Sequence, residues 1–489
     1  MSKGFRLTIK SLHSEVTGSC LIFKIKRPGE PFERFIVDFG GFQEKAYENL
    51  NYSIDVEPSE LSYVIVTHSH LDHVARLPML TQYGFHREIY CTPVCKKSIP
   101  ICLRDSLKIM QSDYDKYGKE MLFTEKELDE TENLLTGIEY NLPTHISRGV
   151  KVTFLGNGHL YGSASILLQI SCHKYEDKNI LITGDYYPRN DLFPVKDIPE
   201  WVLKLPNLTI IQESTYGSTH VEDVTENLDE HITTALANGN NILFPVISQE
   251  RLELVLYRLK LLQDTNQLSK AVKIFVHTEL GKQYLERVYL KAKDIIPFMP
   301  SNVEIIQKGD FETALMHTGQ KIILSSSGMA DQGCVRFYLK NFLPRKDFTV
   351  IFTCYTPKES LGYKLRHSPK DTYIHIDDAC VPLYCDVKHS GELSRHCKYE
   401  DIVEYIEQFH NAKNVLLTHG ETRTKNILYT ELVEKFPNLN FYIMNRKTGF
   451  KLDVDSSVST YPTKFPNSTT SSTLNVTKKE KTIKKDFRR

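Results

Sequence analysis

The sequence has no long hydrophobic run, and its first ten residues contain no hydrophobic core of the kind found in signal peptides. A helix that crosses a membrane needs ~18 or more apolar residues in succession. The absence of such a run excludes the integral membrane class. We therefore expect a soluble, cytoplasmic protein without a membrane partner.

The sequence also lacks an excess of either charge, since it contains 61 Lys and Arg residues and 61 Asp and Glu residues. A neutral chain has no global basic field that would attract nucleic acid. Any affinity for nucleic acid must therefore come from a local basic patch.

The ten cysteines form no recognisable framework, because only Cys91 and Cys95 lie close together. Their spacing matches neither a set of disulfides nor a paired zinc knuckle. We interpret them as reduced, partly buried side chains. A metal or redox pair at Cys91 and Cys95 is the alternative.

The densest group of metal-ligand side chains is His68-Ser69-His70-Leu71-Asp72-His73, which follows the apolar and β-branched run from Leu61 to Thr67. A loop that leaves a buried strand can turn His68 and His70 to one side while Asp72 and His73 reach a second point nearby. Imidazole and carboxylate together suit Zn²⁺. The motif predicts a metal site, and a solvated polar loop is the alternative.

Other polar residues follow apolar runs in the same way. Asp38 comes before a pair of glycines, where it serves either turn chemistry or the support of a metal-binding histidine. His159 lies in a glycine-flanked loop after a predicted strand, and His419 follows another. Asp185 follows the strand Ile180 to Thr183 and is our candidate for a carboxylate between two metals, against an ordinary strand-end turn.

From about residue 218 to 380, apolar strands alternate with helical patterns. Such alternation predicts a parallel sheet covered by helices, which we expect to form a domain of its own. Phosphate-binding loops are expected where parallel strands end. Ser325 to Met329 lies at such a point and suits either a phosphate loop or a plain turn. Before this segment, Thr124 and Glu127 form a predicted capping box that opens a helix.

The last residues, from Asp455 onward, are rich in Ser and Thr and then basic. This composition predicts a disordered tail. The tail either tethers RNA or keeps the chain soluble.

Taken together, the motifs resemble those of the β-CASP group of metallo-β-lactamase-fold nucleases. Its signatures occur in order along nearly the whole chain. They are Val37-Asp38-Phe39-Gly40, His68 to His73, Gly158-His159 with Gly162, Thr183-Gly184-Asp185, Glu213-Ser214-Thr215-Tyr216-Gly217, Ser394-Arg395-His396 and Thr418-His419-Gly420-Glu421.

Within the group, Ser14 to Ser19, Met121 to Glu125 and Ser327-Gly328-Met329 look more like the cleavage-and-polyadenylation endonuclease and its bacterial and archaeal relatives than like ribonuclease J. The DNA-processing branch typically has an apolar residue where this chain has His419, so the resemblance points to RNA. Two positions depart from the family pattern, because Ala75 and Glu250 stand where glycine is usual.

The resemblance implies an α/β fold in which a metallo-β-lactamase αββα sandwich carries an inserted β-CASP domain, a parallel sheet with flanking helices. Residues 1–210 would form the first part of the sandwich and 211–384 the inserted domain. Residues 385–455 would complete the sandwich, and 456–489 would be the disordered tail.

The resemblance also implies a zinc-dependent ribonuclease that hydrolyses RNA phosphodiester bonds by two-metal activation of water. Carried over by position, the ligands of one zinc are His68, His70 and His159, those of the other are Asp72, His73 and His419, and Asp185 bridges the two. His396, oriented by Glu213, is the expected general acid.

RNA would enter a cleft between the two domains and be single-stranded near the scissile bond. Arg251 and Lys358 are the expected phosphate-binding cations, together with the loop at Ser326, Ser327 and Gly328. Mn²⁺ suits the same metal ligands as Zn²⁺.

Three other functions stay open at this point. They are hydrolysis of a small ester or thioester, DNA processing, and a non-catalytic scaffold like the inactive members of the group. The long insertion disfavours the first, and the complete ligand set disfavours the last. The sequence leaves open whether cleavage is internal or proceeds from a 5′ end, and whether a second copy of the chain or an RNA-processing partner takes part.

Overall fold

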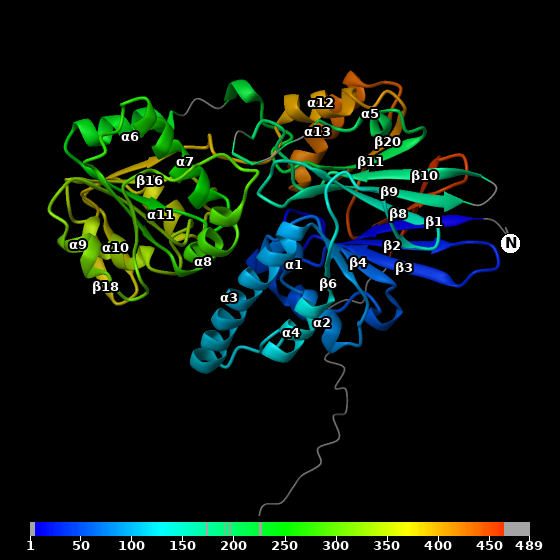
Figure 1. Cartoon of the computed structure of the whole chain (residues 1–489), viewed down its shortest axis with the longest axis horizontal. Coiled ribbons are helices and arrows are strands. Elements are labelled where there is room, and N and C mark those ends of the chain that lie inside the picture. The colour runs from blue at the N-terminus through cyan, green and yellow to red at the C-terminus, as the bar shows by residue number, and fades with distance from the viewer. Residues whose placement is uncertain are drawn as a thin grey trace, which may run out of the picture.

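Three large sheets organise the chain, as Figure 1 shows. The computed structural model describes residues 5–463, apart from 173–174, 191, 194, 196 and 224–226. No helix among the described residues is long and apolar enough to cross a membrane.

The first sheet has eight strands in the order β23-β22-β1-β2-β3-β4-β5-β6. Its strands are β1 (Arg6–Ser11), β2 (Leu21–Lys26), β3 (Phe32–Val37), β4 (Tyr63–Ile65), β5 (Ile89–Cys91), β6 (Leu135–Gly137), β22 (Thr448–Leu452) and β23 (Val458–Pro462). Strand β1 pairs with β2 on one side and with β22 on the other. The sheet therefore joins residues from both ends of the described chain.

The second sheet has seven strands in the order β21-β20-β11-β10-β9-β8-β7. Its strands are β7 (Thr144–Ser147), β8 (Val150–Gly156), β9 (Ala164–Cys172), β10 (Tyr175–Ile182), β11 (Leu208–Glu213), β20 (Ala412–Thr418) and β21 (Asn440–Ile443). One hydrophobic cluster contains Phe23 and Phe35 of the first sheet and Val152 and Ile166 of the second. The two sheets thus pack face to face.

Helices cover the outer face of each sheet. Those on the first sheet are α1 (Leu71–Val74), α2 (Leu77–Gln82), α3 (Pro93–Tyr117) and α4 (Glu125–Leu134), and those on the second are α5 (Glu200–Leu203), α12 (Tyr399–Glu407) and α13 (Thr422–Lys435). Helix α4 begins with the predicted capping box of Thr124 and Glu127. This αββα arrangement confirms the predicted fold class.

The third sheet has six strands in the order β14-β13-β15-β12-β16-β19, and all its pairings are parallel, as predicted. The strands are β12 (Asn241–Pro245), β13 (Lys273–His277), β14 (Val303–Ile305), β15 (Lys321–Ser325), β16 (Phe348–Phe352) and β19 (Asp386–His389). Its helices are α6 (Leu228–Ala237), α7 (Arg251–Asp264), α8 (Glu279–Arg287), α9 (Glu312–Met316), α10 (Val335–Phe342) and α11 (Leu361–His367), and a hairpin of β17 (Tyr373–Ile376) and β18 (Ala379–Pro382) follows.

The inserted domain shares a core with the sandwich. A single hydrophobic cluster contains Leu80 and Leu103 of the sandwich and Leu252 and Leu285 of the inserted domain. The hydrophobic contact therefore continues across the junction of the two domains.

The sheets correct three of the expected boundaries. Strand β11 belongs to the second sheet and crosses the expected boundary at 211, whereas β19 extends the third sheet beyond 384. The expected tail from 456 begins too early, because Val458–Pro462 pairs with β22 as β23. Backbone pairing along the edge of β22 outweighs a composition rich in Ser and Thr. The remainder of the expected tail, 464–489, lies outside the described residues.

The ten cysteines are free, which agrees with the interpretation of reduced side chains. Cys91 and Cys95 are both buried, and the Cys95 thiol donates to the Gly162 carbonyl at 3.1 Å. Burial raises the pKa of both thiols.

The turn after β3 packs directly on the metal-ligand motif. The Phe39 amide donates to the His73 carbonyl at 2.8 Å, and the Gly41 amide donates to the Leu71 carbonyl at 2.9 Å. A Cβ atom on Gly40 would lie 1.5 Å from the Asp72 carbonyl oxygen. The backbone approaches so closely here that only glycine fits.

We expect Gly40→Ala to displace the segment that carries Asp72 and to reduce the unfolding free energy by about 2 kcal/mol or more. The control is Gly29→Ala, where a Cβ atom meets nothing within 4 Å but φ is +78°, so its cost is ~1–2 kcal/mol from backbone strain alone. Thermal melting and bound metal are the measurements. Equal melting temperatures and equal metal contents for the two variants would contradict the close packing.

Candidate active site

The predicted ligands meet at one edge of the sandwich because the strands before them end there. Strands β10, β11 and β20 are mutually parallel, and β4 is parallel to β3. His68 and His70 follow β4, Asp72 and His73 lie in α1, and His159, Asp185 and His419 follow β8, β10 and β20. Loops from both sheets therefore bring all seven side chains together.

Two groups of these side chains have ligand atoms within 4.8 Å of one another, and Asp185 lies between them. One group is His68, His70 and His159, and the other is Asp72, His73, Asp185 and His419. Asp185 Oδ2 is 3.6 Å from His68 Nε2 and 3.8 Å from His159 Nε2. The same oxygen is 3.3 Å from His73 Nε2, and Asp185 Oδ1 is 3.3 Å from His419 Nδ1.

The unsatisfied atoms of this cluster fit a divalent cation. His68 Nε2 and Asp185 Oδ1 are buried and have no hydrogen-bond partner among the described residues. Buried polar atoms without partners are rare in folded proteins. Imidazole nitrogens and carboxylate oxygens are the donor set that Zn²⁺ and similar ions prefer.

The electrostatics of the cluster lead to the same conclusion. Burial, followed by the neighbouring histidines, lowers the pKa of His68 and His159, so both favour the neutral form that binds metal. Burial also lowers the pKa of His73, but the charges of Asp185, Asp38 and Asp72 outweigh it and raise that pKa above its usual value. The carboxylate-rich half of the cluster therefore favours a positive charge.

Asp38 supports His73 rather than only forming a turn. Its Oδ2 atom is 2.8 Å from His73 Nδ1 and accepts a hydrogen bond from Thr67 Oγ1 at 2.8 Å. Its Oδ1 atom accepts from the Thr67 amide, also at 2.8 Å. With Nδ1 engaged, the Nε2 atom of His73 faces Asp185, as a metal ligand requires.

Two supporting residues were not predicted. His13 Nε2 lies 3.1 Å from Thr418 Oγ1, directly before His419, and the Arg395 carbonyl lies 2.7 Å from His159 Nδ1. His13 is an isolated histidine outside the motifs, and Arg395 acts through its backbone. Neither contact has a signal in the residue pattern.

His396 and Glu213 form the expected pair beside the cluster. His396 Nδ1 lies 3.1 Å from Glu213 Oε2, and the Tyr186 amide donates to Glu213 Oε1 at 3.1 Å. Burial alone would lower the pKa of His396, but the charge and hydrogen bonding of Glu213 raise it to about 9. The pair keeps a proton available at His396, which projects beside the ring of His159 at 4.8 Å.

The chain has known relatives across most of its length. Ribonuclease TTHA0252 of Thermus thermophilus is 27% identical over 407 residues, which cover 79% of this chain and 88% of that protein. Endoribonuclease YSH1 of Eremothecium gossypii is 25% identical over 416 residues, 80% of this chain and 52% of that protein. Transcription termination factor FttA of Methanocaldococcus jannaschii is 25% identical over 462 residues, which cover 88% of this chain and 69% of that protein. The chain thus spans about half to two thirds of the last two proteins.

Three family models match successive parts of the chain. The metallo-β-lactamase superfamily matches residues 33–101, the Beta-Casp domain residues 252–365, and the Zn-dependent metallo-hydrolase RNA specificity domain residues 381–442. Together with these relatives, the three matches support a place in the β-CASP family of metallo-β-lactamase-fold nucleases. This confirms the resemblance, and the metallo-β-lactamase fold implies divalent-metal binding at the clusters described above.

The two departures from the β-CASP pattern differ in their consequences. Glu250 has φ of +73°, a conformation that favours glycine, and its side chain is buried. Its Oε2 atom lies 3.5 Å from Arg251 Nε, so an ion pair accompanies the strained backbone. The Ala75 methyl group packs against Gly41, where an added Cβ atom would lie 2.9 Å from that methyl group.

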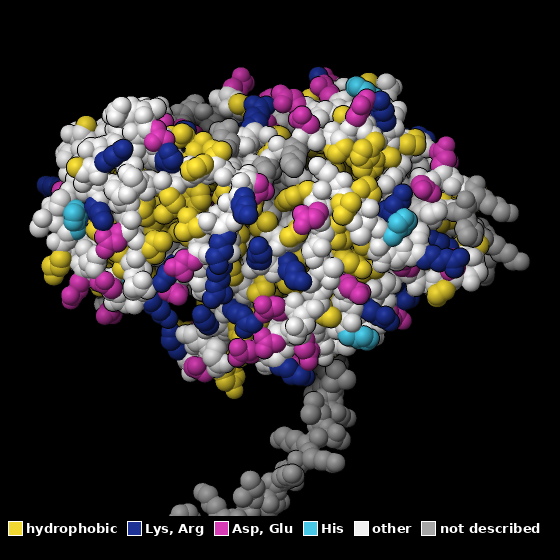
Figure 2. Space-filling model, in the orientation of Figure 1, with side chains coloured by type: hydrophobic (Ala, Val, Ile, Leu, Met, Phe, Trp, Pro, Cys, Tyr) yellow, Lys and Arg dark blue, Asp and Glu magenta, His cyan; other side chains and the backbone are white. Residues whose placement is uncertain are grey.

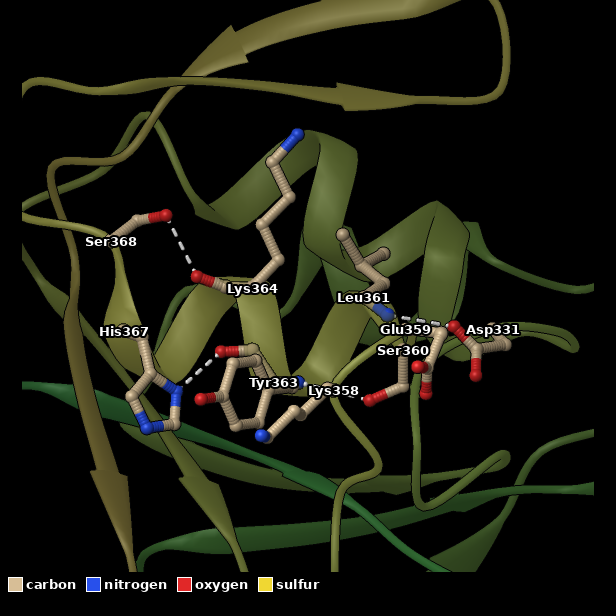
Figure 3. A pocket seen from close by; sticks show the side chains of 9 residues that line it. All are labelled: Asp331, Lys358, Glu359, Ser360, Leu361, Tyr363, Lys364, His367 and Ser368. Carbon is tan, nitrogen blue, oxygen red and sulfur yellow. Dashed lines mark hydrogen bonds between the residues drawn. The ribbon is translucent and has the colours of Figure 1, made fainter. Parts of the chain in front are cut away.

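The predicted substrate-binding residues have different environments. Arg251 is buried and donates to the Thr353 carbonyl at 2.7 Å, so the expectation that it faces the cleft is wrong. The carboxylate of Glu250 forms an ion pair with the Arg251 guanidinium, so the positive charge of Arg251 is compensated inside the protein. Lys358 is exposed at the rim of a cavity (Figure 3). Ser326, Ser327 and Gly328 lie at the end of β15, as predicted for a strand-end loop.

The surface carries a local basic patch even though the chain is neutral. Figure 2 shows Lys and Arg side chains grouped over α3 and the neighbouring α8. Lys96 and Lys97 of α3 and Arg287 of α8 are exposed. A patch of this kind was the condition for nucleic-acid affinity in a neutral chain.

We expect Asp38→Asn to weaken metal binding by about 10- to 100-fold. The asparagine side chain lacks the negative charge with which Asp38 orients His73. Competition with a chelator of known affinity measures the change. The control is Asp378→Asn, whose side chain is 91% exposed. Unchanged metal affinity in Asp38→Asn would show that His73 needs no such support.

Proposed function

We propose that the protein is a zinc-dependent ribonuclease that hydrolyses phosphodiester bonds of RNA held between the sandwich and the inserted domain. The observation that carries this proposal is the convergence of six further ligand side chains around buried Asp185, with the His396 and Glu213 pair beside them. The ribonuclease names of two relatives and the RNA specificity model support the choice of substrate.

His68, His70 and His159 would hold one zinc ion, Asp72, His73 and His419 the other, and Asp185 would contact both. When bound, two divalent ions supply Lewis-acid stabilisation of phosphodiester oxygens and lower the pKa of water at the site. Mn²⁺ is compatible with the same donors. Asp72 and Asp185 balance part of the ionic charge and leave a positive site that suits a phosphodiester.

His396 would protonate the leaving oxygen. Its Nδ1 atom faces Glu213, so the Nε2 atom is free to meet substrate, and the side chain is 20% exposed. Glu213 is 1% exposed and accepts from two backbone amides, those of Tyr186 and Thr215. Fixed in this way, the carboxylate orients the imidazole and stabilises its protonated form.

A small ester or thioester is a weaker candidate for the substrate. The inserted domain places Gln249 within hydrogen-bonding distance of Ser69 in the metal motif, at 2.8 Å. A domain of this size packed onto the metal loop suits a long polymer better than a small molecule. Internal cleavage and trimming from a 5′ end are both compatible with this arrangement.

His396 has an alternative role as a metal ligand, because Asp185, Glu213, His396 and His419 also have ligand atoms within 4.8 Å. We expect His396→Ala to keep the wild-type metal content and to lose ~10²- to 10⁴-fold in turnover, as removal of a general acid does. Metal analysis and RNA cleavage rates are the measurements, with the exposed residue His86 changed to Ala as the control. Loss of metal from His396→Ala would make His396 a ligand.

The direct test of the function is cleavage of end-labelled RNA and sequence-matched DNA by the zinc-loaded protein, with Asp185→Ala as the control. We expect RNA products that are absent with Asp185→Ala, because that change removes the carboxylate between the two ligand groups. Product lengths separate internal cuts from 5′ trimming. Failure to cleave either polymer with zinc bound would refute the ribonuclease and favour a small ester substrate.

A further inference from the structure

One edge of the inserted domain faces the metal centre. Strands β12, β15 and β16 are parallel, so the residues that follow them lie at the same edge of the sheet. Gln249 follows β12, and its side-chain amide donates to Ser69 Oγ. Ser69 lies between the candidate ligands His68 and His70. The segment after β16 therefore starts close to the metal motif.

This segment presents an exposed aromatic side chain. Tyr355 is 62% exposed, although Cys354 before it and Thr356 after it are buried. Burial of its inner part, followed by the carboxylate of Glu421, raises the pKa of the Tyr355 phenol. The carbonyl of Thr353, two residues before Tyr355, accepts from Arg251 at 2.7 Å, and Gln249, two residues before Arg251, donates its side-chain amide to Ser69. Tyr355 therefore follows the part of the inserted domain that packs beside the metal motif.

A cavity of about 500 Å³ continues from this segment along α11. The ring of Tyr363 stacks on the ring of His367 with centroids 3.8 Å apart and 20° between the planes. Figure 3 shows both rings on the same part of α11, with Asp331 at the far end of the cavity. The Leu361 amide donates to Asp331 at 2.8 Å, so that carboxylate is already engaged.

Two cations line the same cavity. Lys358 and Lys364 are exposed, and neither forms an ion pair with a carboxylate in the part of the chain that the structure describes. Tyr355 and His367 are exposed and Tyr363 is half-buried. Accessible aromatic rings next to unpaired cations are the combination that binds single-stranded nucleic acid, because bases stack on the rings and phosphates meet the cations. A duplex has no unstacked base to offer to such rings.

We propose that Tyr355 and the Tyr363–His367 pair form a base-stacking subsite for single-stranded RNA, with Lys358 and Lys364 holding the adjoining phosphates. The subsite rests on the proposed function for the identity of its ligand. It gives the RNA a path that leaves the metal centre over the segment after β16 and continues along α11.

The test measures binding of a fluorescein-labelled 12-nucleotide single-stranded RNA by anisotropy. It uses the metal-loaded full chain with His396→Ala, so that cleavage does not consume the probe. We expect Tyr355→Ala to weaken binding about 5-fold or more, the usual effect of losing one stacked base, and Tyr355→Phe to retain affinity. The matched control is Tyr373→Ala, because Tyr373 is 61% exposed but lies in the hairpin strand β17.

A second probe tests stacking directly. In this probe, the bases of the RNA are replaced one at a time by abasic nucleotides. At one position of the RNA, the replacement should weaken binding to the chain that has Tyr355. The same replacement should not weaken binding to Tyr355→Ala. Lys364→Ala should reduce the salt dependence of binding, because one phosphate contact is lost.

The outcomes separate this inference from the ribonuclease proposal. RNA binding that depends on Tyr355, without RNA cleavage by the wild type, would support the subsite and refute the nuclease. Cleavage by the wild type, with equal binding by the Tyr355→Ala and Tyr373→Ala chains, would overturn the subsite alone. A single abasic effect that persists in Tyr355→Ala would also overturn it.

Discussion

The structure depends on the burial of Asp185 among imidazoles. A buried carboxylate is costly unless opposite charge and hydrogen bonds compensate it. Here its two oxygens lie within 3.8 Å of four histidines that come from both sheets. The strand ends, the glycine turn at Gly40 and the contact between Asp38 and His73 all serve to bring these groups to one point.

The inserted domain also packs against this site. Its α7 begins next to Gln249, whose amide reaches the metal motif, and Arg251 and Glu250 pair in the interior at the same place. One hydrophobic cluster spans the junction. The two domains are therefore linked through the metal motif itself, by polar contacts surrounded by apolar packing.

Much of this arrangement could be predicted from the sequence, because the ligand motifs are short, dense and placed at strand ends. Strand-end geometry alone brings residues such as His68, Asp185 and His419 to one edge. The parallel sheet of the inserted domain was also predictable from the alternation of strands and helices. Local pattern could not reveal that Arg251 is buried, because its partners, Glu250 and the Thr353 carbonyl, are brought to it by a strained turn and by a distant strand. It could not reveal the role of His13 either, which comes only from packing against Thr418.

The order of the ligands along the chain has a consequence for synthesis. His68 and His419 are separated by most of the polypeptide, and β1 finds its neighbour β22 only after Thr448–Leu452 has been made. A chain still growing on the ribosome holds an incomplete ligand set and an unpaired edge strand. Under the proposed function, the nascent protein would stay inactive beside the messenger RNA that encodes it, and activity would begin only after His419 and strand β22 have been made and have left the ribosome.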